Sequence, residues 1–190
     1  MRARFPHLAF LGGVLLLAGC SAPAPAPAAE PAASAPPSTS AAPAVRFEAP
    51  AKLKGLPRTT ADKWTKGPKS TTTFFRRKVQ SPTGTLAAAY LDPDDISQSI
   101  EVSAAAGRVY DPAVTLRQLV ANLELELADV RPADPGTPGG VGTCGLSRKN
   151  QPAVVTLCHW AEPGSVGSVT IWSLADRRDW FADVRAQIQP

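Results

Sequence analysis

The chain has few of the side chains that usually carry catalytic or metal chemistry. Its 190 residues include two histidines, three cysteines and one methionine. His159 is the only histidine beyond the first 20 residues, so a triad of nucleophile, histidine and carboxylate has a single candidate base. There is no G-x-S-x-G nucleophile elbow, and a zinc site would need four ligands. We therefore expect no metal and no cofactor. We interpret His159 as an exposed or hydrogen-bonded strand residue, which by alternation points to the face opposite Cys158 and Trp160.

Long apolar runs are also absent. The longest covers residues 8–18, whereas a membrane-spanning helix needs about 20 apolar residues. Arg2 and Arg4 precede this run and Leu17-Ala18-Gly19-Cys20 closes it, as in a secretory signal peptide. The closing tetrad resembles the lipobox of bacterial lipoproteins, which implies cleavage before Cys20 and attachment of a diacylglyceryl group to its thiol. The alternatives are an uncleaved helix and a cysteine that stands at the cleavage site by coincidence.

Composition divides the rest of the chain. Residues 21–45 contain 11 alanines and seven prolines, which offer too little to bury to offset the entropy of ordering. We expect an extended linker of roughly 3.1 Å per residue, either a bare spacer or an O-glycosylated stalk. The predicted organisation is a signal peptide at 1–19, a lipidated cysteine and disordered linker at 20–45, and one globular domain at 46–190.

Residue spacing within 46–190 predicts strands and helices. Asp111 and Pro112 form a favourable helix start, and a Pro-Gly turn at 81–84 separates two β-rich runs. Strands are expected at 73–80, 85–91, 99–105, 153–160 and 166–173, a loop at 131–142, and helices at 112–128 and 176–188. Strands that pair as hairpins and are followed by helices predict the α+β class: an antiparallel sheet with two amphipathic helices packed on it and one disulfide.

Cys144 and Cys158 are the candidates for that disulfide. Disulfides persist outside the membrane, and the short connection 149–152 would bring the two predicted strands opposite each other. Closing a loop of this size would contribute about 3 kcal/mol. The alternatives are a redox pair, which usually has C-x-x-C spacing, and a metal pair.

The C-terminal part of the chain carries a second resemblance. Its motifs are Pro135-Gly136, Gly139-Gly140, Cys144-Gly145, Cys158-x-Trp160-Ala161-Glu162 and Gly167-Ser168-Val169. With the lipobox and the Ala/Pro linker, they are similar to uncharacterised exported lipoproteins of high-GC actinobacteria. The resemblance implies export, a disulfide and an acidic residue after the Trp-Ala pair, here Glu162, and it implies no activity.

Positive charge is concentrated just after the linker. Residues 46–78 carry ten basic side chains against two acidic ones, whereas 79–190 carry eight against thirteen. The candidate residues for contact with an anionic surface are Lys63, Lys66, Lys69, Arg76, Arg77 and Lys78. An anionic lipid or wall polymer would attract them by about 1 kcal/mol per residue. The alternative is that the block folds against the acidic remainder, and nucleic acid is not an expected partner outside the membrane.

The remaining motifs are less specific. Asp92, Asp94 and Asp95 lack the spacing of a calcium loop and indicate a solvated turn. The four tryptophans indicate core anchors, with a ligand groove as the alternative. The glycines of 136–145 lack the G-K-[ST] of a phosphate loop.

Two functions remain. The first is a lipid-anchored lipoprotein on the extracytoplasmic face of the bacterial cell membrane, with a non-catalytic domain that binds an envelope protein, an anionic polymer or a small ligand. The second is a cell-envelope hydrolase or transferase. The presence of one histidine only beyond the signal peptide, and the lack of a catalytic motif, favour the first. A pocket with converging polar groups and a strongly perturbed carboxylate would favour the second.

Overall fold

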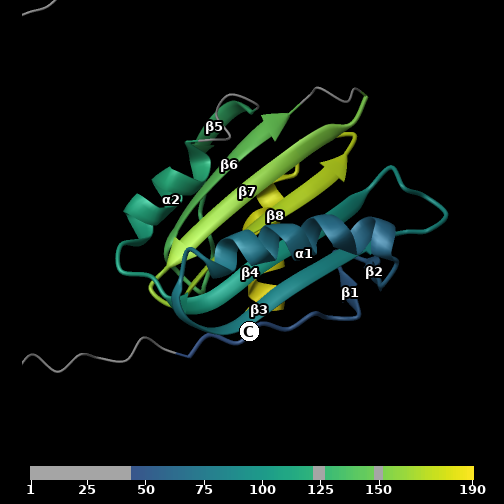
Figure 1. Cartoon of the computed structure of the whole chain (residues 1–190). Helices are drawn as coiled ribbons and strands as arrows, with labels where there is room; N and C mark the ends of the chain where they lie inside the picture. Colours follow the sequence, from purple (N-terminus) through teal and green to yellow (C-terminus); the bar gives the residue numbers. More distant parts are fainter. Residues whose placement is uncertain (1–43, 122–126, 148–151) are drawn as a thin grey trace, which may run out of the picture. The chain divides into compact units, whose positions relative to one another are not determined.

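Figure 1 shows the fold, a computed structural model that describes residues 44–121, 127–147 and 152–190. Cys20 and most of the predicted linker lie outside the described residues. The strands are β1 (Lys52–Leu53), β2 (Leu56–Thr59), β3 (Gln80–Leu91), β4 (Ser99–Arg108), β5 (Ala128–Pro132), β6 (Val141–Ser147), β7 (Val154–Glu162) and β8 (Ser165–Ser173). The helices are α1 (Asp62–Arg76), α2 (Pro112–Val120), the short 3-10 helix η1 (Arg178–Trp180) and α3 (Phe181–Ile188).

The strands form one antiparallel sheet in the order β1-β2-β3-β4-β8-β7-β6-β5. At its centre β4 pairs with β8, so that Ser99 lies opposite Trp172 and Ala106 lies opposite Ser165. The α+β class with an antiparallel sheet is therefore confirmed. The strands predicted at 99–105, 153–160 and 166–173 are β4, β7 and β8.

The two faces of the sheet carry different helices. In Figure 1, α1 lies along β3 and β4, and α2 lies along β6 and β7. Phe75 of α1 and Leu116 of α2 share a core cluster with Ala105 of β4. The next residue along β4, Ala104, belongs to the cluster that contains Phe181 of α3. Since neighbouring strand residues point to opposite faces, α1 and α2 cover one face and α3 covers the other.

Helix α1 was not expected from the sequence. The strand predicted at 73–80 is wrong, because residues 73–76 belong to α1, and the predicted turn at 81–84 lies inside β3. Within the described residues, three α-helices therefore pack on the sheet, where two were expected.

Tertiary contacts explain why this threonine-rich segment is helical. Its buried side chains, Thr65, Pro68, Thr72 and Phe75, recur every three or four residues and so form one face of a helix. The Thr72 hydroxyl donates to the Leu86 carbonyl at 2.8 Å, which satisfies a buried polar group. Packing on β3 and β4 thus overrides the β-propensity of the threonines.

Helix α2 begins as predicted and ends earlier. The Asp111 carboxylate accepts a hydrogen bond from the Val114 amide at 2.9 Å, and Pro112 occupies the first turn. The helix predicted over 112–128 ends at Val120, residues 122–126 lie outside the described residues, and 128–132 form β5. Strand β5, which pairs with β6, therefore includes the last residue of the predicted helix, Ala128, and the first two residues of the predicted loop, 131–132.

The C-terminal helix predicted at 176–188 corresponds to η1 and α3. Helix α3 packs on the face of the sheet where the Trp160 side chain of β7 lies against Gly167 of β8. Trp160 lies directly opposite Gly167, and its indole ring occupies the space that a Cβ at Gly167 would need. The Ser103 carbonyl oxygen would be only 2.6 Å from the same Cβ. Glycine at this position therefore allows the largest side chain of the core to fit.

Candidate functional site

A buried ion pair lies on the α3 face of the sheet. Glu162 is the last residue of β7, and Arg185 projects inward from α3. Arg185 Nη2 lies 3.4 Å from Glu162 Oε1, and the two side chains are 0% and 7% exposed. The Arg185 guanidinium also lies over the Trp160 ring, 5.1 Å from its centroid. Burial lowers the pKa of Arg185, and the charge of Glu162 opposes that change.

The carboxylate of Glu162 is the centre of a hydrogen-bond network. The Ser165 hydroxyl donates to its Oε1 at 2.5 Å, and Trp160 Nε1 donates to the Ser165 oxygen at 3.0 Å. The Gln189 side-chain amide donates to the same Oε1. The Glu162 carboxylate therefore has two hydrogen-bond donors on Oε1, Ser165 and Gln189, and its charge is balanced by Arg185.

Arg185 connects the same network to the loop between β5 and β6. Its Nη1 donates to the Pro135 carbonyl at 3.0 Å and to the Gly139 carbonyl at 2.8 Å. The pair thus joins β7, α3 and this loop. The network therefore has a structural role: it holds these three parts of the fold together.

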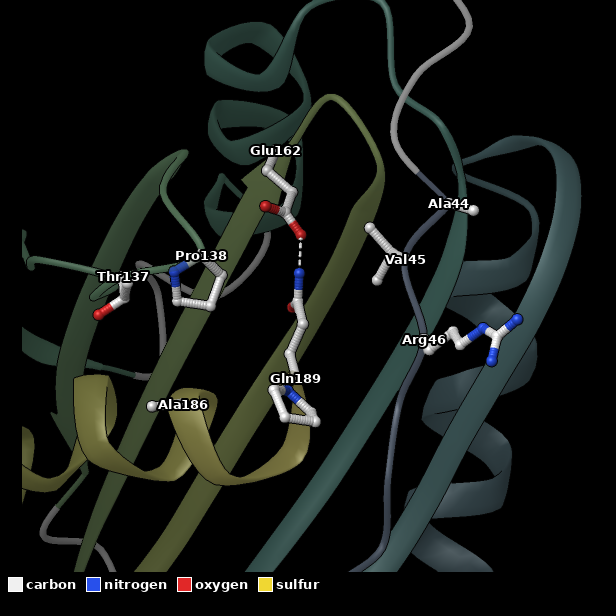
Figure 2. A pocket seen from close by; sticks show the side chains of 9 residues that line it. Ala44, Val45, Arg46, Thr137, Pro138, Glu162, Ala186 and Gln189 are labelled. Carbon is white, nitrogen blue, oxygen red and sulfur yellow. Dashed lines mark hydrogen bonds between the residues drawn. The ribbon is translucent and has the colours of Figure 1, made fainter.

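A cavity of about 590 Å³ opens beside this network, and Figure 2 shows Glu162 and Gln189 on its wall. Its lining residues are Ala44, Val45, Arg46, Thr137, Pro138, Glu162, Ala186, Gln189 and Pro190. Small and apolar side chains form most of the lining, and its cation, Arg46, is exposed. The cavity therefore offers space for a small molecule but presents a carboxylate that is already paired.

The sequence indicated only half of this site. Glu162 came from the resemblance of its Trp-Ala-Glu motif, without a role. Arg185 was missed, although it follows Phe181 by four residues on the face that also carries Val184 and Ile188. A charged residue on the apolar face of a predicted helix was the available signal, because such a residue needs a buried partner.

His159 lies on the other face, beneath α1. As predicted, it faces away from Cys158 and Trp160, but it is only 6% exposed and its ring packs edge-on against Phe75 at 6.1 Å. Burial lowers the pKa of His159 to about 4, so the imidazole is neutral at pH 7. Glu101, on the same face, has its pKa raised by burial near α1.

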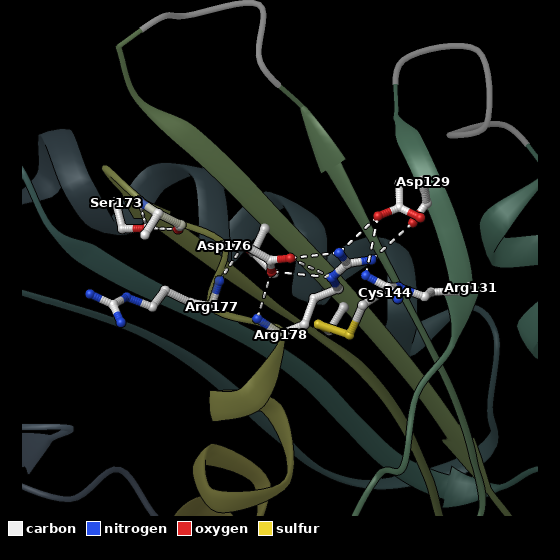
Figure 3. A network of polar contacts seen from close by, with 10 residues as sticks. Asp129, Arg131, Cys144, Ser173, Asp176, Arg177 and Arg178 are labelled. Carbon is white, nitrogen blue, oxygen red and sulfur yellow. Dashed lines mark hydrogen bonds and ion pairs between the residues drawn. A yellow bond between two sulfur atoms is a disulfide. The ribbon is translucent and has the colours of Figure 1, made fainter.

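A second polar network fixes the segment before α3 (Figure 3). Arg178 Nε donates to Asp176 Oδ2 at 2.9 Å, and Arg178 Nη2 donates to Asp129 Oδ2 at 2.8 Å. Arg131 pairs with the same Asp129 oxygen at 3.2 Å. The hydrogen bonds from Arg178 lower the pKa of Asp176. This network connects η1 to the edge strand β5, where Asp129 has a positive φ of 53°.

The predicted disulfide is confirmed. Cys144 of β6 lies directly opposite Cys158 of β7, with 4.0 Å between their Cα atoms, and the two sulfurs are bonded. Both cysteines are fully buried in the cluster beneath α3. The bond therefore joins two neighbouring strands of the core.

The predicted basic residues occupy two parts of α1 and its continuation. Lys63, Lys66 and Lys69 are exposed on the N-terminal half of the helix, where Lys69 Nζ lies 3.5 Å from Asp62. Arg76 and Arg77 are exposed at its C-terminal end, and Lys78 is partly buried. A different member of the block, Lys54, pairs with Asp183 of the acidic remainder at 3.0 Å. The block therefore makes one of the expected intramolecular ion pairs and also presents a charged surface.

The other candidate residues lie apart from the buried pair. Asp92 and Asp95 accept hydrogen bonds from the backbone amides of Asp94 and Ser97 in the β3–β4 loop, as in a solvated turn. Of the four tryptophans, Trp160 is a buried core anchor as predicted, whereas Trp64, Trp172 and Trp180 are only partly buried. Within the described residues, no group of three or more histidine, cysteine or acidic side chains is arranged to hold a metal ion.

No known protein family, curated protein or solved structure matches the chain. None of the helices in the described part is both long and apolar enough to cross a bilayer.

Proposed function

We propose that this chain is a lipoprotein, anchored by diacylated Cys20 to the extracytoplasmic face of a bacterial membrane, whose domain binds a partner without catalysing a reaction. The lipobox-like tetrad that ends in Cys20 supports the anchor, and the Ala/Pro-rich segment after it has the composition of a spacer. The buried disulfide agrees with an oxidising compartment.

The non-catalytic part of the proposal rests on one observation: the two side chains that could act as a general base are already engaged or buried within the fold. Glu162 is bound by Ser165, Gln189 and Arg185, all within its own fold. His159 is buried and neutral beneath α1. A general base needs a free acceptor within hydrogen-bond distance of its substrate. Glu162 borders the cavity, but its Oε1 already has three partners, and His159 is covered by α1.

The anchor is tested by the intact mass of protein extracted from membranes. We expect residues 20–190 with a lipid on Cys20, whereas Cys20→Ala should leave an uncleaved precursor or a soluble product. An unmodified Cys20 at the membrane would contradict the anchor.

Labelling tests the absence of catalysis. A fluorophosphonate probe reacts with activated serines, and we expect it to leave the native protein and heat-denatured protein equally unlabelled. Stoichiometric labelling of one serine, lost on denaturation, would show instead that the domain is a hydrolase or transferase.

A further inference from the structure

Two exposed aromatic rings have cations beside them. Phe74, in the last turn of α1, is 44% exposed, and Tyr110, two residues after β4, is 70% exposed. Lys78 Nζ lies 5.0 Å from the Phe74 ring centroid, and the Arg108 guanidinium lies 5.8 Å from that of Tyr110. At a membrane interface, aromatic rings lie at the level of the head groups while long basic side chains extend to the phosphates.

The two aromatic–cation pairs belong to one surface. Gln80, the first residue of β3, pairs with Arg108, the last residue of β4. Lys78 therefore lies two residues before the point where the two strands meet. Val79 packs against Gly107, where an added Cβ would lie 2.8 Å from Val79 Cγ2. Val79 and Val109 also share the core cluster of Phe75. The contacts of the buried valines therefore place the last turn of α1, with Phe74, and the segment after β4, with Tyr110, at the same end of the sheet.

The Pro163–Gly164 turn between β7 and β8 lies at this same end of the sheet, which we call the proximal end. The described part of the chain also begins there. The Gly107 amide donates to the Gly164 carbonyl at 3.0 Å, and the Val109 amide donates to the Pro163 carbonyl at 2.9 Å. Figure 2 shows Ala44, the first described residue, at the end of the sheet where Glu162 lies. A lipid on Cys20 would therefore pull the proximal end toward the bilayer, a step that rests on the proposed function.

We propose that this surface docks on an anionic membrane leaflet, with Phe74 and Tyr110 entering the head-group layer. The docking surface consists of Phe74, Arg76, Arg77, Lys78, Arg108 and Tyr110. Its acidic neighbour, Asp111, is engaged as the N-cap of α2, accepting from the Val114 amide. Charge complementarity therefore favours anionic phospholipid, at about 1 kcal/mol per basic residue. Lys63 and Lys66 belong to the other half of α1 and contribute less.

The first test measures binding of residues 20–190 carrying Cys20→Ser to vesicles of equimolar phosphatidylglycerol and phosphatidylcholine. Arg76→Gln with Arg77→Gln should lower the partition coefficient by roughly 30-fold, since each charge contributes about fivefold. The matched control, Lys63→Gln with Lys66→Gln, removes the same charge from the same helix and should have a clearly smaller effect. Equal losses in the two variants would overturn the proposal, because net charge would then explain the binding.

The second test locates the rings. A spin label at Tyr110→Cys should gain oxygen exposure and lose nickel-chelate exposure on these vesicles, while a label at Leu174→Cys should not change. Leu174 is 65% exposed and follows the opposite end of β8, so it is the matched control. A label at 110 that stays in water on vesicles that bind the protein would overturn membrane docking by the rings.

Both tests use a chain without the lipid. Their failure would therefore leave the anchor intact, and an unmodified Cys20 would leave these binding results unchanged.

Discussion

The Glu162→Gln substitution removes the negative charge that faces Arg185 and leaves the shape of the side chain almost unchanged. Arg185 is fully buried and remains charged at any pH at which the protein folds. The variant therefore contains a buried cation whose nearest counter-charge, at 3.4 Å, has gone.

The size of the effect follows from what still surrounds the guanidinium. Breaking a buried ion pair by removing one partner costs about 3–5 kcal/mol. Arg185 keeps its hydrogen bonds to the Pro135 and Gly139 carbonyls and its position over Trp160, which partly replace the lost interaction. We therefore expect the free energy of unfolding to fall by about 3 kcal/mol, out of the roughly 5–15 kcal/mol typical of a domain.

Urea unfolding of a double-mutant cycle measures this pair. Arg185→Met should also destabilise the domain, whereas the double variant should lose less than the sum of the two, because neither charge is then left unpaired. Glu48→Gln is the control: Glu48 is an exposed acid, and its loss should change stability by less than about 0.5 kcal/mol. Additive effects, or a loss below about 1 kcal/mol for Glu162→Gln, would refute the view that charge pairing holds this network together.

Three further predictions address the core. Replacing Cys144 and Cys158 by serine should lower the free energy of unfolding by about 3 kcal/mol, and non-reducing peptide mapping should recover the linked pair from native protein; free thiols there would contradict the bond. Because the pKa of His159 is about 4 when folded and near 6.5 when unfolded, the unfolded chain binds the proton first, and stability should fall by roughly 3 kcal/mol as pH drops between those values. Urea unfolding of His159→Leu over this range should show a shallower fall, and identical slopes would exclude His159 as the cause. Gly167→Ala should unfold at markedly lower urea, since its methyl group has no space beside the indole ring, whereas Gly84→Ala, whose added Cβ would lie 3.9 Å from the Ala106 Cβ, should be nearly neutral.

The elements that could be predicted are those with a local pattern of residues, such as alternation in a strand or a capping residue at a helix start. The alternation of β4, β7 and β8 matches a two-sided sheet, and the Asp111–Pro112 start of α2 is a local signal. The disulfide followed from two strands joined by a short connection. Each of these predictions depended on neighbours in the chain and needed no knowledge of the distant fold.

The buried pair could not be predicted in this way. Arg185 is positioned beside Glu162 by hydrogen bonds to the backbone carbonyls of Pro135 and Gly139, which have no signature in the side-chain sequence. Hydrogen bonds to backbone carbonyls depend on where a loop is placed. The sequence therefore indicated a charged residue on an apolar helix face and not its partners.

The missed helix α1 accounts for a second difference, at His159. Alternation along β7 correctly placed His159 on the face opposite Cys158. Its burial depends on what covers that face, which is α1 through Phe75. Because residues 73–80 were predicted to form a strand, no helix was expected over His159. The sequence therefore predicted an exposed or hydrogen-bonded histidine. The depressed pKa of His159 is therefore a consequence of α1, and any change that detaches α1 from the sheet should return that pKa toward 6.5.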